Sequence, residues 1–330
     1  MKIGEDSLIE RIRRRIPSAD RGLLRLGIGD DAAALRPAPG TQLVVTCDMF
    51  LEDVHFLAHT YPAEAVGYKA LARATSDIPA MGARPELFLL SLSLPAERTG
   101  RWFDRMLSGM ARAARQFGMR LAGGDTAQSP KKNPKIGLSI TVIGTAEGGR
   151  ILRRSGAHPG DSIFVSGRPG AAQLGLELIL RGRFTEGRWK QLLAPQYYPK
   201  LALALGPWLA QRGVASAAMD ISDGLSIDLH RLCKASGVGA RIEAGKIPCV
   251  AVPDELRSLK LDALTLALHG GEDYALLFTV PKRLAARIPR MFRWTKLTQI
   301  GEIVRRRGVR LIGADGKDSP LEPLGWDHFR

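Results

Sequence analysis

The chain has 330 residues, of which 45% are hydrophobic and 25% are charged, and its formal net charge is +15. This length and composition are typical of a globular protein of about two domains, and they exclude a low-complexity or disordered chain. No apolar stretch reaches the roughly 18 residues that a membrane span needs, so we expect no membrane segment. The three cysteines, Cys47, Cys233 and Cys249, lack the spacing of a disulfide framework or a zinc site.

The basic residues of the chain fall in short runs. The N-terminus is interrupted by acidic residues and has no apolar segment of the secretory type, so we expect a cytoplasmic location. Arginine runs at 11–15, 153–154 and 305–310 have no interleaved aromatic residues. Such runs are typical of a solvated surface, and they leave a nonspecific affinity for polyanions open. We predict no specific nucleic-acid partner.

In the first half, periodicity predicts helices and strands in alternation. The segment 62–83 predicts a helix that ends near Pro79. Leucine and serine alternate over 90–94, and apolar and small residues alternate over 136–142, so each segment predicts a half-buried strand. Between them, apolar residues at helical spacing predict a helix over 101–118.

The second half begins after a change of composition. The segment 147–161 is rich in glycine and arginine and has no periodicity, which is typical of an interdomain connection. Beyond it we predict strands at 161–167, 274–281, 297–303 and 309–316, and helices at 170–182, 200–213 and 223–237. Because strands and helices mix without a regular βαβ count, the expected fold class is α+β (α/β mixed), with domains over 1–148 and 149–330.

Carboxylates recur in one kind of context, beside small residues or at the end of an apolar strand. The motifs are "GIGDDAA", "VVTCDMF", "TSDIPAMGA", "LAGGDTA", "MDISDGLS" and "GGEDYAL". Taken singly, most of these acids could be helix caps or turn residues. Asp48 differs because it ends an apolar strand, where a buried carboxylate requires a cation or hydrogen-bond donors. Taken together, the acids are typical of an oxygen-ligand site for several Mg²⁺ ions.

Several other chemistries lack their motifs in this sequence. There is no Walker lysine motif, no zincin helix, no G-x-S-x-G elbow and no protein-kinase catalytic loop. The glycines of 27–32 follow no buried strand, which argues against a dinucleotide fingerprint.

The acidic motifs, with "GEDSLIERI", "DMFLEDVHF", "YKALARATSDIPAMGA", "RSGAHPGD" and "GWDHF", occur in the order of a known family. The chain resembles the thiamine-monophosphate kinases nearly end to end; their superfamily includes aminoimidazole ribonucleotide synthetase and selenophosphate synthetase. The resemblance implies a two-domain PurM-like architecture. Its N-terminal domain (1–148) would bind ATP and Mg²⁺ and pair through its sheet in a homodimer, and its C-terminal domain (149–330) would be of α/β type. It also implies ATP-dependent phosphorylation of thiamine monophosphate to thiamine diphosphate.

The resemblance implies a role for each site residue. Mg²⁺ would be held by Asp31, Thr46, Cys47, Asp48, Asp77, Asp125, Asp220 and Asp223. ATP would be contacted by Gly123, Gly124, Arg150 and Ser222. The thiamine substrate would be contacted by His55, Glu272 and Trp326. No residue is assigned as a general acid or base, because the acceptor phosphate is already ionised at neutral pH. Asp30 is expected to be a cap or a supporting neighbour of Asp31.

Structural alternatives stay open for the substrate residues. His55 could be a core histidine, Trp326 could dock the C-terminus, and Glu272 could be a turn acid. The chain also departs from the family pattern at Cys47, at Ala74 and over 196–200, where "QYYPK" replaces an arginine-containing run. A thiol is a poor Mg²⁺ ligand.

Two alternative functions stay open. The first is another ATP-using small-molecule kinase or synthetase of the superfamily. Selenophosphate synthetase is disfavoured, since residues 1–30 contain no cysteine. The second is a catalytically idle polyanion-binding protein.

Overall fold

The computed structural model describes residues 5–28, 31–327 and 329. The chain divides into two compact units: the first is Met1–Ile78 with Ala83–Gly149, and the second is Pro79–Gly82 with Arg150–Arg330. Both units combine helices with a sheet, which confirms the predicted α+β fold class. Within the described residues, every helix is too short or too polar to cross a membrane.

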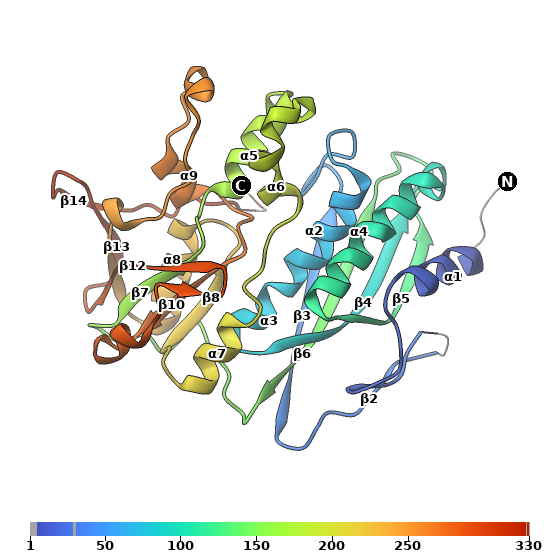
Figure 1. Cartoon of the computed structure of the whole chain (residues 1–330), viewed down its shortest axis with the longest axis horizontal. Helices are drawn as coiled ribbons and strands as arrows, with labels where there is room; N and C mark the ends of the chain where they lie inside the picture. The colour runs from blue at the N-terminus through green and yellow to red at the C-terminus, as the bar shows by residue number, and fades with distance from the viewer. Residues whose placement is uncertain (1–4, 29–30, 328, 330) are drawn as a thin grey trace. The chain divides into compact units, whose positions relative to one another are not determined.

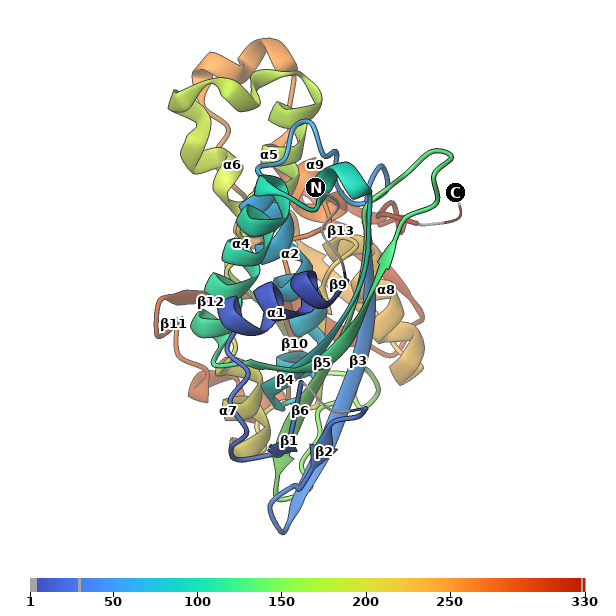
Figure 2. The ribbon, with the colours of Figure 1, turned by 90° about the vertical axis from the view of Figure 1, so that its right-hand side faces the viewer.

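The first unit is built on a four-stranded sheet of order β3-β6-β4-β5. β6 is antiparallel to both β3 and β4, whereas β4 and β5 are parallel. Helices α2 and α4 cover one face of this sheet (Figure 1), as its side view also shows (Figure 2). The elements are α1 (Glu5–Arg15), β1 (Leu24–Leu26), β2 (Ala34–Leu35), β3 (Thr41–Leu51), α2 (Ala63–Thr75), α3 (Asp77–Ala80), β4 (Arg84–Leu94), α4 (Arg101–Phe117), β5 (Arg120–Gln128) and β6 (Gly137–Glu147).

The predicted strands and helices of this unit are confirmed, and their burial follows the sequence pattern. Leu90, Leu92 and Leu94 of β4 are buried, while Ser91 between them is exposed. One face of α4, including Phe103 and Met110, is fully buried.

Two glycines let α2 and α4 approach each other closely. A Cβ on Gly67 would lie 1.9 Å from the carbonyl oxygen of Met106, and a Cβ on Gly109 would lie 1.9 Å from that of Glu64. Each helix therefore presents a glycine to the backbone of the other, and no larger residue fits at either position.

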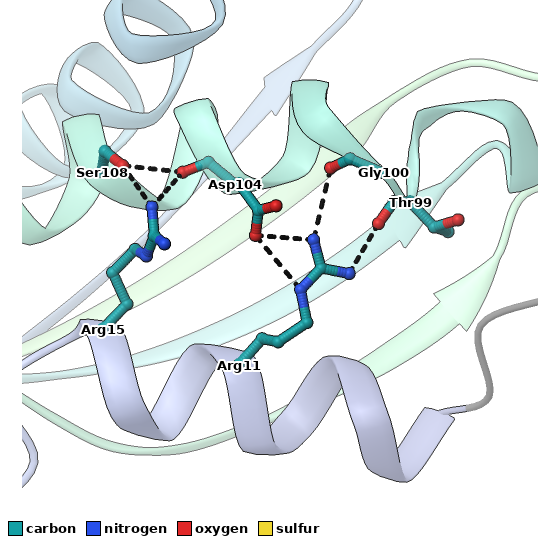
Figure 3. Close-up of polar contacts among 6 residues, drawn as sticks. All are labelled: Arg11, Arg15, Thr99, Gly100, Asp104 and Ser108. Carbon is teal, nitrogen blue, oxygen red and sulfur yellow. Dashed lines mark hydrogen bonds and ion pairs between the residues drawn. The ribbon is translucent and has the colours of Figure 1, made fainter.

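Two arginines anchor α1 to the N-terminal half of α4 (Figure 3). Arg11 donates from Nε and Nη2 to Asp104 Oδ1, at 3.1 and 2.6 Å, and from Nη1 to the carbonyl oxygen of Thr99 at 2.7 Å. Arg15 Nη1 donates to the carbonyl oxygen of Asp104 and to Ser108 Oγ, at 2.9 and 2.5 Å. Asp104 lies in the first turn of α4, where a negative charge interacts favourably with the helix dipole. The same carboxylate therefore stabilises α4 and binds α1.

The second unit contains an eight-stranded sheet with the path β14-β13-β9-β12-β7-β10-β8, and β11 pairs with β12 off this path. Its strands are β7 (Ser162–Ser166), β8 (Ala217–Ile221), β9 (Gly239–Glu243), β10 (Ala275–Val280), β11 (Met291–Phe292), β12 (Thr295–Val304), β13 (Gly308–Ile312) and β14 (Asp318–Pro320). Its α-helices are α5 (Ala171–Leu180), α6 (Lys190–Tyr197), α7 (Leu205–Arg212), α8 (Leu225–Ser236) and α9 (Ala263–His269).

Each face of this sheet has its own core. Ile163 and Val165 of β7 belong to a cluster with Leu229 of α8. Phe164, between them on the strand, belongs to a different cluster with Leu209 of α7. This alternation arises because successive side chains of a strand point to opposite faces of the sheet. Helices therefore pack on both faces. All strands and helices predicted for this half are confirmed. Their bounds are shorter than predicted, except that β12 (Thr295–Val304) extends beyond the predicted 297–303 at both ends.

Candidate functional site

The carboxylate of Asp48 lies on the face of β3 that α2 covers. Its Oδ2 accepts a hydrogen bond from Arg73 Nε of α2 at 3.1 Å, in a partly buried ion pair. Thr46, two residues earlier on the same face, donates from Oγ1 to Asp77 Oδ2 at 2.6 Å. Two predicted carboxylates and one predicted hydroxyl are therefore gathered where β3 meets the end of α2. All three groups offer oxygen donors.

The side chain of Cys47 lies on the opposite face of β3. It is exposed, and its Sγ lies 3.4 Å from Ser139 Oγ of β6. The thiol therefore lies on the opposite face of the sheet from the side chains of Thr46, Asp48 and Asp77.

Asp125 is also separated from Asp48. Asp125 of β5 stands opposite Ser91, Ser91 stands opposite Ser139, and Ser139 stands opposite Met49 of β3. Residues directly opposite one another share a face of the sheet, so Asp125 projects on the face of Met49 and not on that of Asp48. The strands β3 and β5 form the two edges of the sheet, three strand spacings or about 14 Å apart.

The two glycines before Asp125 have different structural roles. A Cβ on Gly124 would lie 1.9 Å from the carbonyl oxygen of Leu90 in the neighbouring strand, whereas a Cβ on Gly123 would meet only the side chain of Leu89 at 3.5 Å. The pairing of β4 with β5 therefore requires glycine at 124 and not at 123.

We expect Gly124→Ala to lower the free energy of unfolding by about 2–3 kcal/mol, since the methyl group forces β4 and β5 apart. Gly123→Ala is the matched control and should change stability by less than about 0.5 kcal/mol. Urea unfolding of both variants measures the difference, and equal midpoints for the two would contradict the assignment.

Two further predicted residues of this unit lie elsewhere. Asp31 is exposed and precedes β2, while Asp30 lies outside the described residues. His55 is half-buried after β3; its Nδ1 accepts the backbone N–H of Leu51 at 2.9 Å, and its ring stacks on Phe50. This bond assigns the ring proton to Nε2.

In the second unit, a buried aspartate organises the loop after β8. Asp228 Oδ2 accepts the backbone N–H groups of Ser222, Asp223 and Gly224 at 3.1, 3.1 and 3.2 Å. Its side chain is 0% exposed, and burial, with the nearby charge of Asp223, raises its pKa to about 6. Arg231 Nη1 bridges Asp228 Oδ1 at 2.7 Å and Asp223 Oδ2 at 2.5 Å. Asp228 is not among the residues predicted from the sequence, although an acid in the first turn of α8 was a signal for it.

Glu272 is held against this loop by backbone and side-chain bonds. Its N–H donates to the carbonyl oxygen of Ser222 at 2.7 Å, and its Oε2 accepts from Gln196 Nε2 at 2.6 Å. Its φ is +68°, a left-handed conformation that disfavours residues with a side chain. Gln196 is 1% exposed. The carboxylate of Glu272 is therefore fixed by a buried amide.

The chain's C-terminal segment reaches the same loop. The N–H of Trp326 donates to the carbonyl oxygen of Asp223 at 2.9 Å, and the Trp326 side chain is 50% exposed. The structure therefore brings together Ser222, Asp223, Glu272 and Trp326, which come from three separate segments.

The remaining predicted residues of the second unit have other positions. Asp220 is buried in β8, opposite Leu276. Arg150 donates to the carbonyl oxygen of Gln211 in the last turn of α7, at 2.9 Å. Asp273, next to Glu272, accepts the N–H groups of Gly170 and Ala172 and so caps α5; burial raises its pKa to about 7.

Domain matches place the chain in a class of proteins. Residues 29–146 match the family described as AIR synthase related protein, N-terminal domain, and residues 158–314 match AIR synthase related protein, C-terminal domain. The two matches follow one another along the chain, and together they define a protein of the AIR synthase related class with the predicted two-domain architecture.

Relatives that match nearly the whole chain identify the family within this class. The thiamine-monophosphate kinase of Synechococcus elongatus is 34% identical over 99% of this chain and 97% of that protein. A crystal structure of thiamine-monophosphate kinase from Stenotrophomonas maltophilia covers 97% of this chain and 99% of that chain, with a TM-score of 0.80 and 36% identity. The structure of AaThiL complexed with AMPPCP and TMP aligns with 100% of this chain and covers 99% of its own chain. Its TM-score is 0.76 and its sequence identity is 34%. The chain belongs to the thiamine-monophosphate kinase family.

Proposed function

We propose that this protein transfers the γ-phosphoryl group of ATP to the phosphate of thiamine monophosphate, giving thiamine diphosphate and ADP. The observation that carries this proposal is the full-length similarity to AaThiL, a protein solved with AMPPCP and TMP. The acceptor phosphate is ionised at neutral pH, so the reaction requires charge neutralisation and positioning, and no base.

Several Mg²⁺ ions would supply that neutralisation, and the donor chemistry of the site fits them. Among the described residues, no three His, Cys, Asp or Glu side chains form a group that could hold a metal. Mg²⁺ does not need such a cage, because it is usually held by one or two carboxylates together with water and substrate phosphates. Asp48 and Asp77, with the Thr46 hydroxyl that donates to Asp77, would offer that set.

The other assignments extend this proposal. Asp31, Asp125, Asp220 and Asp223 would be further ligands, and Cys47 would contribute its backbone and not its exposed thiol. Gly123, Gly124, Arg150 and Ser222 would contact ATP. Residues 1–148 would form the ATP, Mg²⁺ and dimerisation domain, and 149–330 the C-terminal domain. We also expect a cytoplasmic location, for which the three free thiols are suitable.

We infer a homodimer that pairs through the β3 part of the first unit's sheet, on the face opposite α2 and α4. On β3 the exposed side chains of this face are apolar: Leu43 is 40%, Val45 59% and Met49 56% exposed. A row of apolar side chains on a sheet face favours contact with another protein surface. Asp125 projects on this same face, so pairing would bring Asp125 of each copy to the second copy.

The substrate would be recognised by His55, Glu272 and Trp326. An indole can stack on a thiazolium or pyrimidine ring, and a carboxylate can pair with a cationic ring. Glu272 and Trp326 both bond to the loop at 222–223, which supports a common role for them.

We predict that Gln196→Leu raises the KM for thiamine monophosphate about tenfold while kcat changes less than threefold, because a buried bond to a charged group is worth about 1.5–3 kcal/mol. Gln196 touches Glu272 and orients it. Gln299→Leu, at an exposed amide bonded to Ser162, is the control. An unchanged KM in Gln196→Leu, or an equal rise in the control, would remove Gln196 from substrate binding.

The proposed function is tested by incubating the purified chain with ATP, Mg²⁺ and thiamine monophosphate and separating the products chromatographically. Thiamine diphosphate and ADP should appear in equal amounts, and EDTA should stop the reaction. ATP turnover with another acceptor only would favour a different enzyme of the superfamily. Absence of any turnover, with salt-sensitive polyanion binding, would favour a catalytically idle protein.

A further inference from the structure

A strongly basic segment of the second unit has no part in the proposed reaction. The segment 281–296, "PKRLAARIPRMFRWTK", contains six cationic residues, and the nearest acidic residues along the chain are Asp273 and Glu302. The cations are Lys282, Arg283, Arg287, Arg290, Arg293 and Lys296, and all six are exposed. We call these six residues the basic surface.

The cations of the basic surface lack the acidic partners that several other cations of this molecule have. Ion pairs join Arg11 to Asp104, Arg105 to Glu64 and Arg310 to Asp318, among others. None of the six forms a side-chain ion pair with any residue in the described part of the chain. Their charge is therefore available to an external anion.

A folded framework holds the basic surface. The 3₁₀ helix Lys282–Arg287 places Leu284 and Ala285 against the core that also contains Phe292. β11 and the start of β12 form a hairpin (Figure 2), in which Met291 stands opposite Lys296. Leu284, Ala285 and Phe292 are thus packed against the core, while the six cations are exposed.

Aromatic rings lie among these cations. Trp294, at the turn of the hairpin, is 58% exposed. Phe292 packs on Trp208 of α7 with ring centroids 5.3 Å apart. The guanidinium of Arg293 lies 6.0 Å from the Phe292 ring centroid, and that of Arg212 lies 5.8 Å from the Trp208 ring centroid. These guanidinium groups and the exposed indole provide planar groups beside positive charge.

We propose that the basic surface, with Trp294, binds single-stranded nucleic acid without sequence preference. Cations that track a phosphate backbone, combined with aromatic and guanidinium planes on which bases stack, are the two elements of such binding. A membrane is the less suitable partner, because the exposed apolar side chains at this hairpin are only Met291 and Trp294. Stable membrane anchoring requires a larger apolar surface.

The test measures binding of the full-length protein to fluorescent single strands of about 20 nucleotides, as RNA and as DNA of the same sequence, over a range of salt concentrations. We expect Arg287→Gln, Arg290→Gln and Arg293→Gln combined to reduce the salt slope by about 2, since each lost phosphate contact removes about 0.7. The matched control is Arg305→Gln, Arg306→Gln and Arg307→Gln combined, which removes the same charge from the exposed turn between β12 and β13. This control should leave binding unchanged.

A second variant separates stacking from charge. Trp294→Ala should weaken oligonucleotide binding about 5- to 100-fold and leave binding of inorganic polyphosphate, which has no bases, unchanged. Binding of the RNA or of the DNA strand supports the proposal, and the strand that binds more tightly identifies the preferred nucleic acid. Equal loss in both arginine triples, an equal effect of Trp294→Ala on polyphosphate, or binding to anionic vesicles but not to oligonucleotides would overturn it. Thiamine diphosphate formation should be unaffected by all these substitutions, so this test is independent of the proposed function.

Discussion

Asp48→Asn is expected to reduce kcat for thiamine diphosphate formation roughly 100- to 1000-fold, the cost of removing one preorganised charge from a phosphoryl-transfer site. Asparagine has nearly the same volume as aspartate but cannot supply the negative charge that a Mg²⁺ ion needs. The substitution also removes the ion pair with Arg73, so stability should fall by about 1 kcal/mol. Steady-state kinetics at saturating substrates, with a thermal unfolding curve, separates the two effects.

Asp53→Asn is the matched control for this experiment. Asp53 lies near the end of the same strand, is about half exposed and pairs with Lys135 at 2.5 Å. Its φ is +67°, a conformation that asparagine tolerates. This variant should keep wild-type kcat. If Asp48→Asn also kept it, or if both variants lost activity equally, Asp48 would not be a metal ligand.

Val45→Asp combined with Met49→Asp is expected to convert the proposed homodimer into a monomer. Each substitution would bury an unpaired carboxylate in the pairing face, and two such costs of several kcal/mol raise the dissociation constant at least about 1000-fold. Because Asp125 projects on the same face, turnover should fall together with dimerisation. Light scattering coupled to size exclusion, over a range of protein concentrations, measures the mass.

Leu180→Asp is the control for the dimer experiment. Leu180 is 61% exposed at the end of α5 in the second unit, so the same change of chemistry there should leave the mass unchanged. A wild-type protein that is monomeric at all concentrations would refute the dimer. A double variant that stays dimeric would assign the contact to another surface.

Local patterns were sufficient to predict several of the longer elements of the fold. β4 and β6 each have 11 residues with clear alternation, and α4 has 17 residues with one apolar face. The elements that were not predicted include α1 with 11 residues and β5 with nine. They also include α6, which has eight residues with Pro195 inside it, and α9, which has seven. β9 has five residues and depends on pairing with β12 and β13. Its identity as a strand arises from contacts distant in sequence, which a local pattern does not contain.

The candidate site was partly predictable, because its motifs are local but the arrangement of its strands is not. The motifs identified Asp48 and Asp77 with Thr46, and Ser222 and Asp223 with Glu272 and Trp326, and the structure brings each of these sets together. The motifs did not reveal that β3 and β5 form opposite edges of the sheet, because strand order is a long-range property. They also missed Asp228 and Gln196, which contact other site residues through bonds that depend on the folded loop.

The conformation of Glu272 has a consequence for how this sequence can change. A residue with a side chain in the left-handed conformation costs about 1 kcal/mol or more compared with glycine. Gly270 and Gly271, which precede Glu272, have the conformational freedom that Glu272 lacks. Glu272→Gly would relieve this strain, but it would also remove the bond from the buried Gln196 amide, which is worth about 1.5–3 kcal/mol. Glycine at 272 would therefore stabilise the fold only where Gln196 is also replaced, so we expect positions 196 and 272 to change together.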